Sequence, residues 1–169
     1  MEVGSVREAS TKLLDRILGF FPRVEAKASF LFAIDTGLLA LMALNFRLPD
    51  LTTWYIIAPA VIAVLLIAAS LYFVYRCIFP DLKGGTSSLV YFQEIAKRTE
   101  ANFVAEFTQQ EAEAHNGDVL GQVWRNAEIL SRKFADVKMA FILTGLALIP
   151  WFAFLVATAV THAQAVLIK

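Results

Sequence analysis

Three long apolar stretches alternate with polar ones along this chain. They run from about 28 to 46, from 54 to 75 and from 139 to 161, and the second and third contain no charged residue. At a rise of 1.5 Å per residue, about nineteen helical residues cross a hydrocarbon core of roughly 30 Å. The pattern predicts an all-α integral membrane protein with three transmembrane helices, of which the stretch from 54 to 75 is the clearest.

The polar segment before the first crossing is expected to be an amphipathic helix. Over residues 5–21, apolar side chains recur at helical intervals and charged ones occupy the opposite face. Pro22 then breaks or redirects the helix. Such a helix lies either on the membrane surface or against the cytosolic part of the protein itself, and the sequence leaves both open.

The polar insert between the second and third crossings is expected to be a cytosolic helical module. Ser87 or Ser88 can cap a first helix, which Thr99 interrupts. The Gly84–Gly85 pair is interpreted as part of a flexible link and not as a phosphate loop, because no strand precedes it.

One long helix is predicted to join the insert to the third crossing. Residues 115–117 are expected to form a turn, and Asp118 to cap a helix that runs to about residue 161 with Pro150 as its one breaker. We therefore expect a continuous rod that carries motion from the insert into the membrane. The chain is expected to divide into four parts. They are a cytoplasmic N-terminal helix at 1–27, two transmembrane helices at 28–76, a sensor module at 77–138, and a third transmembrane helix with a short external tail at 139–169.

The basic residues predict the orientation. Residues 1–27 carry five Lys or Arg and residues 76–138 carry eight, against Arg47 and Lys169 on the other side. Basic residues concentrate in cytoplasmic segments. We expect the N-terminus and the insert to be cytoplasmic and the C-terminus to be periplasmic.

Four stretches of the chain together carry a family resemblance. They are Glu25-Ala-Lys-Ala-Ser-Phe-Leu, Phe79-Pro80, Ser88 through Ala96, and Gln122 through Ala127-Glu-Ile-Leu-Ser-Arg-Lys133-Phe. In order and spacing over nearly the whole chain, they resemble the transmembrane effectors of bacterial Pycsar antiphage systems.

This resemblance implies a function. Members of the family are paired with a nucleotide cyclase, so a cyclic nucleotide made during infection would bind the cytosolic part. The effector would then impair the bacterial inner membrane and stop growth, as in abortive infection. Glu25 stands where the family motif has Asp, and the resemblance does not say which nucleotide applies.

The side chains that suit a cyclic nucleotide are cations for its phosphate and planar groups for its base. Arg125 and Arg132 are seven residues apart and Gln122 precedes Arg125 by three, so a phosphate can lie along that edge of the long helix. For each single residue, a structural role is a stronger interpretation than ligand contact. Phe92 and Trp124 are expected to be core between cytosolic helices, and Lys133 and Lys138 to be interfacial anchors. The candidate ligand residues are Tyr91, Lys97, Arg98, Gln122, Arg125, Arg132 and Lys133.

Asp35 is the unusual residue of the first crossing. A carboxylate at this depth costs about 3 kcal/mol on insertion scales. Ser70 and Thr144 are expected at the same depth and can bond to it. Asp35 then either fixes helix packing, aided by the small Gly37 and Gly145, or faces a subunit interface or pore.

Composition narrows the function further. The chain is 58% hydrophobic with a mean hydropathy of +0.61 and zero net charge, which favours a membrane protein and no nucleic-acid partner. No Cys/His cluster or catalytic triad motif appears, so we expect no enzyme, no metal site and no cofactor besides the activating nucleotide.

Two alternatives to a ligand-gated effector remain. One is a small channel or transporter subunit, and the other is a structural membrane partner protein; neither takes a nucleotide ligand. Three helices enclose too little volume for a pore. The ligand-gated effector and the channel subunit therefore both require a homo-oligomer.

Overall fold

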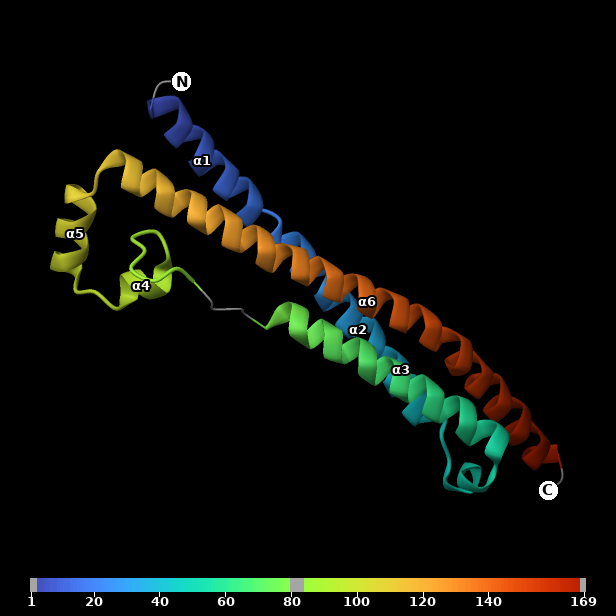
Figure 1. The fold of residues 1–169 in the computed structure, drawn as a ribbon. Helices are drawn as coiled ribbons and strands as arrows, with labels where there is room; N and C mark the ends of the chain where they lie inside the picture. Colours follow the sequence, from blue (N-terminus) through green and yellow to red (C-terminus); the bar gives the residue numbers. More distant parts are fainter. Residues whose placement is uncertain (1–2, 80–83, 168–169) are drawn as a thin grey trace. The chain divides into compact units, whose positions relative to one another are not determined.

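The computed structural model describes residues 3–79 and 84–167, and it is all-α, as predicted. Three helices are long and apolar enough to cross a membrane, within Val6–Asn45, Trp54–Ile78 and Ala112–Gln164. The pattern of apolar positions thus predicted the fold class correctly. The elements in order are α1 (Val3–Leu18), α2 (Phe21–Asn45), the 3₁₀ helix η1 (Leu48–Thr52), α3 (Trp54–Ile78), α4 (Phe92–Ala96), α5 (Glu100–Gln109) and α6 (Ala112–Leu167) (Figure 1).

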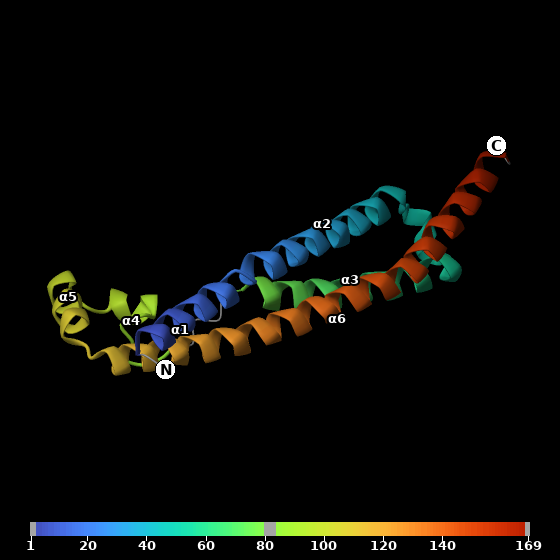
Figure 2. The ribbon, with the colours of Figure 1, turned by 90° about the horizontal axis from the view of Figure 1, so that it is seen from above.

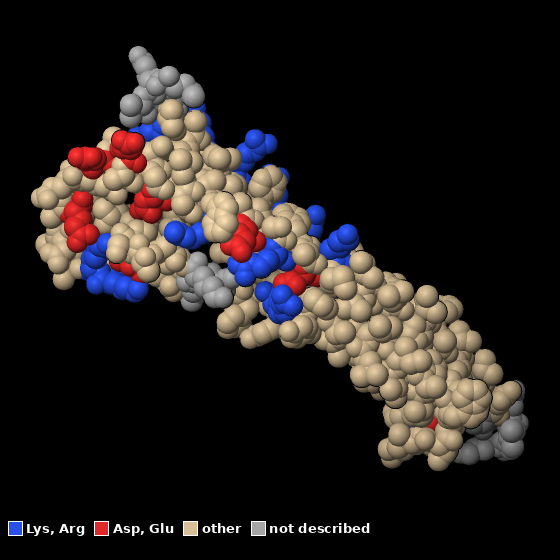
Figure 3. Space-filling model, viewed as in Figure 1, with Lys and Arg blue, Asp and Glu red and all other residues tan. Residues whose placement is uncertain are grey.

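The chain divides into two compact units. Unit 1 consists of residues 1–24 and 80–132, and unit 2 of residues 25–79 and 133–169. Pro80, Lys83 and Lys169, which entered the expected domain division or orientation, lie outside the described residues. On the face seen in Figure 3, charged side chains are dense over unit 1, while most of unit 2 is uncharged.

Unit 2 is a bundle of α2, α3 and the C-terminal part of α6, which run side by side in both ribbon views (Figure 2). Small residues of α3, such as Ala60 and Ala63, let the helices approach closely, as is common inside membranes. Large apolar side chains point outward instead, where lipid replaces water. The buried core consists of Leu38, Met42, Ile56, Ala60, Ala63, Ile67, Ala147 and Phe154.

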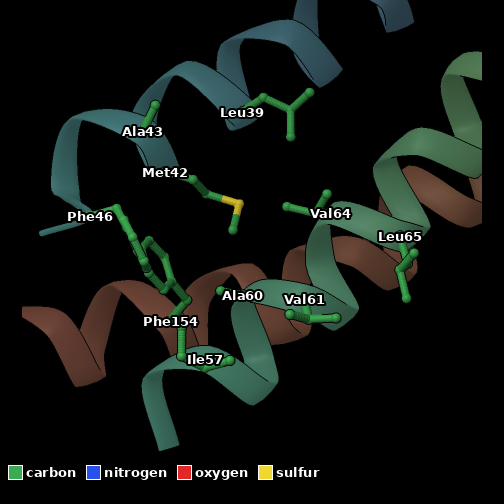
Figure 4. Close-up of a pocket in the computed structure, with 10 residues that line it drawn as sticks. All are labelled: Leu39, Met42, Ala43, Phe46, Ile57, Ala60, Val61, Val64, Leu65 and Phe154. Carbon is green, nitrogen blue, oxygen red and sulfur yellow. The ribbon is translucent and has the colours of Figure 1, made fainter. Parts of the chain in front are cut away.

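An apolar hollow of about 540 Å³ opens in this bundle among α2, α3 and α6 (Figure 4). Every residue that lines it is apolar, from Leu39 on α2 to Phe154 on α6. A phosphate or a base edge would have no hydrogen-bond partner there. The hollow is therefore no candidate for a nucleotide site.

Unit 1 packs α1 against the N-terminal part of α6. The Ser10 hydroxyl donates to Asn116 Oδ1 at 2.6 Å, and Leu14 and Val119 are buried. Of the two positions left open for the N-terminal helix, this contact supports the one against the protein itself. Thr99 caps α5 by accepting a bond from the Asn102 amide, which agrees with the predicted interruption.

The expected turn at 115–117 is wrong, because α6 already begins at Ala112 and includes these residues. Asp118 is therefore no helix cap. Its Oδ2 accepts bonds from the Leu89 amide at 2.8 Å and the Ser88 hydroxyl at 3.0 Å. Tertiary bonds through Asn116 and Asp118 outweigh the poor helix propensity of this stretch.

The continuity of α6 is confirmed. The helix is unbroken between Phe134 and Phe141 and continues through Pro150 to Leu167. At the other boundary, Pro22 is the second residue of α2, a position where its missing N–H costs nothing. One helix thus belongs to both units.

Candidate functional site

Three of the candidate ligand residues border one hollow of unit 1. Tyr91, Gln122 and Arg125 line a cavity of about 290 Å³. Its lining provides one cation, amide side chains, aromatic rings and several aliphatic side chains. The other lining residues come from α1, α6 and the segment around the start of α4: Leu14, Leu18, Val90, Phe92, Asn126 and Ile129.

A second hollow of unit 1 shares Arg125 with the first. Its volume is about 260 Å³, and Arg132 and Trp124 also border it. The seven-residue spacing placed Arg125 and Arg132 on one face of a helix, and both side chains reach this hollow. Arg125 therefore stands where the two hollows meet.

The half-buried Arg125 guanidinium makes no hydrogen bond and no ion pair among the described residues. Buried and half-buried polar groups in proteins normally have a partner. A guanidinium presents five N–H donors in a planar fork that matches a phosphate. Arg125 thus has donors left for an anion.

Gly84 and Gly85 press against these side chains. A Cβ atom on Gly85 would lie 2.1 Å from Arg125 Nη1, and one on Gly84 would lie 1.8 Å from the Tyr91 ring. Only glycine permits such close approach of backbone to side chain. The sequence interpretation as a flexible link missed this contact, although a glycine pair is the signal for it.

Lys97 and Arg98 directly follow α4, and their side chains bond to α4, to the turn before it and to α5. Arg98 bonds Glu106 at 2.7 Å and also donates to the backbone carbonyls of Ser88 and Glu94. Lys97 pairs with Glu94. That bond, followed by one from the Ser87 amide, lowers the pKa of the Glu94 carboxyl. Both cations hold the turn together, and neither borders the two hollows.

Gln122 has a structural contact as well. Its side chain is buried and its Nε2 donates to the Ser88 hydroxyl at 3.3 Å. The same hydroxyl accepts the Tyr91 amide at 2.9 Å. Ser88 therefore links Gln122 and Asp118 of α6 to the turn that positions Tyr91.

Lys133 belongs to unit 2 and not to the ligand hollows. Its buried ammonium bonds Glu25 Oε1 at 3.0 Å and the Cys77 carbonyl. It thus joins the start of α2 to the last carbonyls of α3, where a cation is favourable. Glu25 and Lys133 come from two of the stretches that carry the family resemblance. On the same helices, Arg76 pairs with Asp136 at 3.5 Å.

The expectation that Phe92 and Trp124 form core between helices is wrong. Their exposed fractions are 62% and 67%. Periodicity placed Trp124 on an apolar face but could not say that no other described residues cover this face.

Asp35, Ser70 and Thr144 lie together in the middle of unit 2. The Thr144 hydroxyl donates to Asp35 Oδ1 at 2.9 Å and lies 2.9 Å from the Ser70 hydroxyl. All three residues are buried. Gly37 and Gly145 do not assist this packing as expected, because a Cβ on either would have no atom within 4 Å.

A pair that the sequence reasoning missed closes the other end of unit 2. His162 Nε2 lies 3.1 Å from Asp50 Oδ1, and Asp50 Oδ2 accepts the Arg47 amide at 2.7 Å. Asp50 is buried, so η1 is held to α6. No local pattern reveals a contact between residues 112 positions apart.

These features define a class: an all-α protein with three helices long and apolar enough to cross a membrane, and a polar helical unit in which Arg125 has no partner among the described residues. A family model described as the Pycsar effector protein domain (PycTM) matches residues 9–160. The chain belongs to this family of transmembrane effectors. No curated protein and no solved structure shows significant similarity to it.

Membership gives the protein a role in antiphage defence as a multi-pass membrane effector, and it implies a signal made by a cyclase. The effector domain is a membrane domain, and no catalytic domain is identified.

Proposed function

We propose that this effector binds a cyclic nucleotide in the paired hollows of unit 1 and then impairs the inner membrane. The observation that carries the proposal is the Arg125 guanidinium, which borders both hollows and has no partner among the described residues. The cyclase-made signal that the family implies carries a phosphate diester, and this anion fits an unpaired arginine.

The rest of the ligand fits the other lining groups. A base can stack on Tyr91 or Phe92, and its edge can bond to the amide of Asn126. The first hollow, about 290 Å³, is at the small end of ligand sites, so a ligand would extend past Arg125 toward Arg132. Lys97, Arg98 and Lys133 are left out of this proposed site because other contacts occupy them.

Transmission is assigned to α6. The proposed ligand contacts Gln122 and Arg125 lie on the same unbroken helix as Thr144 and Phe154 of the transmembrane bundle. A ligand that favours one position of this helix in unit 1 also biases its position in unit 2. The distribution of basic residues supports a cytoplasmic unit 1 and a periplasmic end at η1.

Impairment of the membrane is proposed to need several copies, because three helices cannot enclose a pore. Leu120, Trp124 and Ala127 are exposed at spacings of four and three residues, which is the seam of a coiled coil. We assign this seam to a second copy of the chain, since identical seams are self-complementary.

The test is ligand binding by detergent-solubilised protein. A panel of cyclic mono- and oligonucleotides is titrated in a thermal-shift assay, and the best ligand is then measured by calorimetry. A true ligand raises apparent stability by mass action. Arg125→Ala should weaken that ligand about 10- to 100-fold, because a charged hydrogen bond contributes about 1.5–3 kcal/mol.

Lys12→Ala is the matched control, because Lys12 is an exposed cation of unit 1 that pairs with Glu8 and does not border the hollows. It should bind like the wild type. If no nucleotide in the panel shifts the wild-type protein, the proposal is wrong and a channel or structural partner without a nucleotide ligand takes its place. If Arg125→Ala binds the ligand unchanged, the paired hollows are not the binding site.

A further inference from the structure

Asp35 holds an oxygen atom whose bonding the nucleotide proposal does not explain. The side chain is completely buried in unit 2, and its Oδ1 accepts a bond from Thr144. Its Oδ2 is buried with no hydrogen-bond partner among the described residues. A buried carboxylate oxygen without a donor or a cation is strongly unfavourable.

Further oxygen atoms are linked to this carboxyl group through Thr144, whose hydroxyl bonds Oδ1. Ser70 Oγ lies 2.9 Å from Thr144 Oγ1 and 3.2 Å from the Ala140 carbonyl, toward which it donates. The group therefore combines one carboxylate, two hydroxyls and one backbone carbonyl, from α2, α3 and α6. Hydroxyl groups rotate, so they can turn lone pairs toward a positive charge. Oxygen donors of this kind suit small hard cations.

The basic side chains of the three helices lie away from this group. On α2, Lys27 precedes Asp35 by eight residues, or about 12 Å of helix, and it lies over the Phe134 ring. On α3, Arg76 is six residues, or about 9 Å, beyond Ser70 and pairs with Asp136.

On α6, Lys133 is eleven residues from Thr144 and bonds Glu25, while Lys138 is six residues away and exposed. The remaining titratable side chains of α3 near this end include Tyr72 and Tyr75, which are largely exposed, and Cys77, which is buried near Lys133. Among the described residues, no side chain supplies Asp35 with a positive charge.

We propose that Asp35, Ser70 and Thr144 form a binding site for a sodium ion inside the transmembrane bundle. A sodium ion beside Oδ2 removes the uncompensated charge. The site stands on the geometry of unit 2 alone and does not depend on nucleotide binding. It gives the bundle a place to hold a cation about 10 Å beyond Ala28 along α2.

The test is a sodium titration of the purified full chain, in which sodium replaces choline at constant pH and ionic strength. The readout is the apparent melting temperature. A sodium site raises the melting temperature as the sodium concentration rises, by mass action.

Asp35→Asn should abolish the response, while Thr36→Ala, at an adjacent exposed position whose hydroxyl bonds its own helix, should keep it. Thr144→Val keeps the carboxylate and the side-chain shape, and should weaken the apparent cation affinity severalfold. This variant decides the matter if Asp35→Asn does not fold. The proposal is overturned if the wild type does not respond to sodium, or if Thr144→Val and Asp35→Asn respond as the wild type does.

Discussion

The two units keep their polar groups satisfied in different ways. In unit 2, the buried bonds of Asp35 and Asp50 join different helices across long separations, 109 residues between Thr144 and Asp35 and 112 between His162 and Asp50. In unit 1, many bonds are local, such as those of Arg98 to Glu94 and to Glu106, four and eight residues away. The surrounding solvent explains the difference, because lipid offers no hydrogen bonds and water does.

This difference assigns separate tasks to the units. A bundle whose helices are joined by buried bonds between distant residues has few alternative arrangements. The short α4 of unit 1 and the turn before it, which depend on local bonds, open at low cost in free energy. This part of unit 1 is where a ligand can most easily change the structure, and Arg125, which has no partner among the described residues, borders the hollow beside it.

The largest expected effect comes from breaking an interhelical bond of unit 2. Lys133→Met removes the cation from Glu25 and from the Cys77 carbonyl. Losing one partner of a buried pair costs about 3–5 kcal/mol, and Glu25 is partly exposed, so we expect about 2–3 kcal/mol. The measurement is the melting temperature in detergent. Lys138→Met, an exposed lysine of the same helix, is the control; equal melting of the two variants would contradict the role of Lys133.

The next effect should be confined to unit 1. Asp118→Ala leaves the Leu89 amide and the Ser88 hydroxyl without their acceptor, at a cost of about 1–2 kcal/mol. Hydrogen exchange should become faster in residues 87–96 and stay unchanged in α3. Glu113→Ala, on the exposed first turn of α6, should change neither region. Faster exchange throughout α3 would show that the units do not open separately.

Sequence reasoning succeeded for features that repeat along the chain. Apolar runs predicted the three long helices, and the absence of a breaker near Phe134 predicted the continuous α6. Residue spacing along α6 also placed Arg125 and Arg132 at one hollow. These features repeat with the period of a helix, so a short window of the sequence is enough to detect them.

It failed where a distant residue decides the outcome. Asn116 and Gly117 suggested a turn, but Ser10 bonds Asn116 and the helix continues. Trp124 looked like core, and it is exposed because no element in the described part of the chain covers it. Lys133 was grouped with ligand residues, whereas Glu25 holds it in unit 2. Local patterns do not contain the identity of a partner a hundred residues away.

A smaller effect is expected at the other end of unit 2. His162→Leu removes one bond from Asp50 but leaves the Arg47 amide in place, so the cost should be about 0.5–1.5 kcal/mol. Exchange of the η1 amides should become faster, because α6 no longer holds this helix. Gln164→Leu, an exposed change one half-turn further along, should leave η1 unchanged. If both variants exchange alike, the Asp50–His162 pair does not hold η1.

The smallest effect is a pH dependence within unit 1. The Lys97 and Ser87 bonds lower the pKa of Glu94 below its ordinary value of 4.5, so this carboxylate stabilises the fold above that value. The contribution is lost as the pH falls through the lowered pKa, because protonation removes both bonds. Glu94→Gln should flatten this acid limb of the melting curve against pH, while Glu111→Gln, an exposed change outside the turn, should keep it. An equal acid limb in both variants would mean that the turn before α4 does not depend on this charge, and that the local bonds of unit 1 are weaker than their geometry suggests.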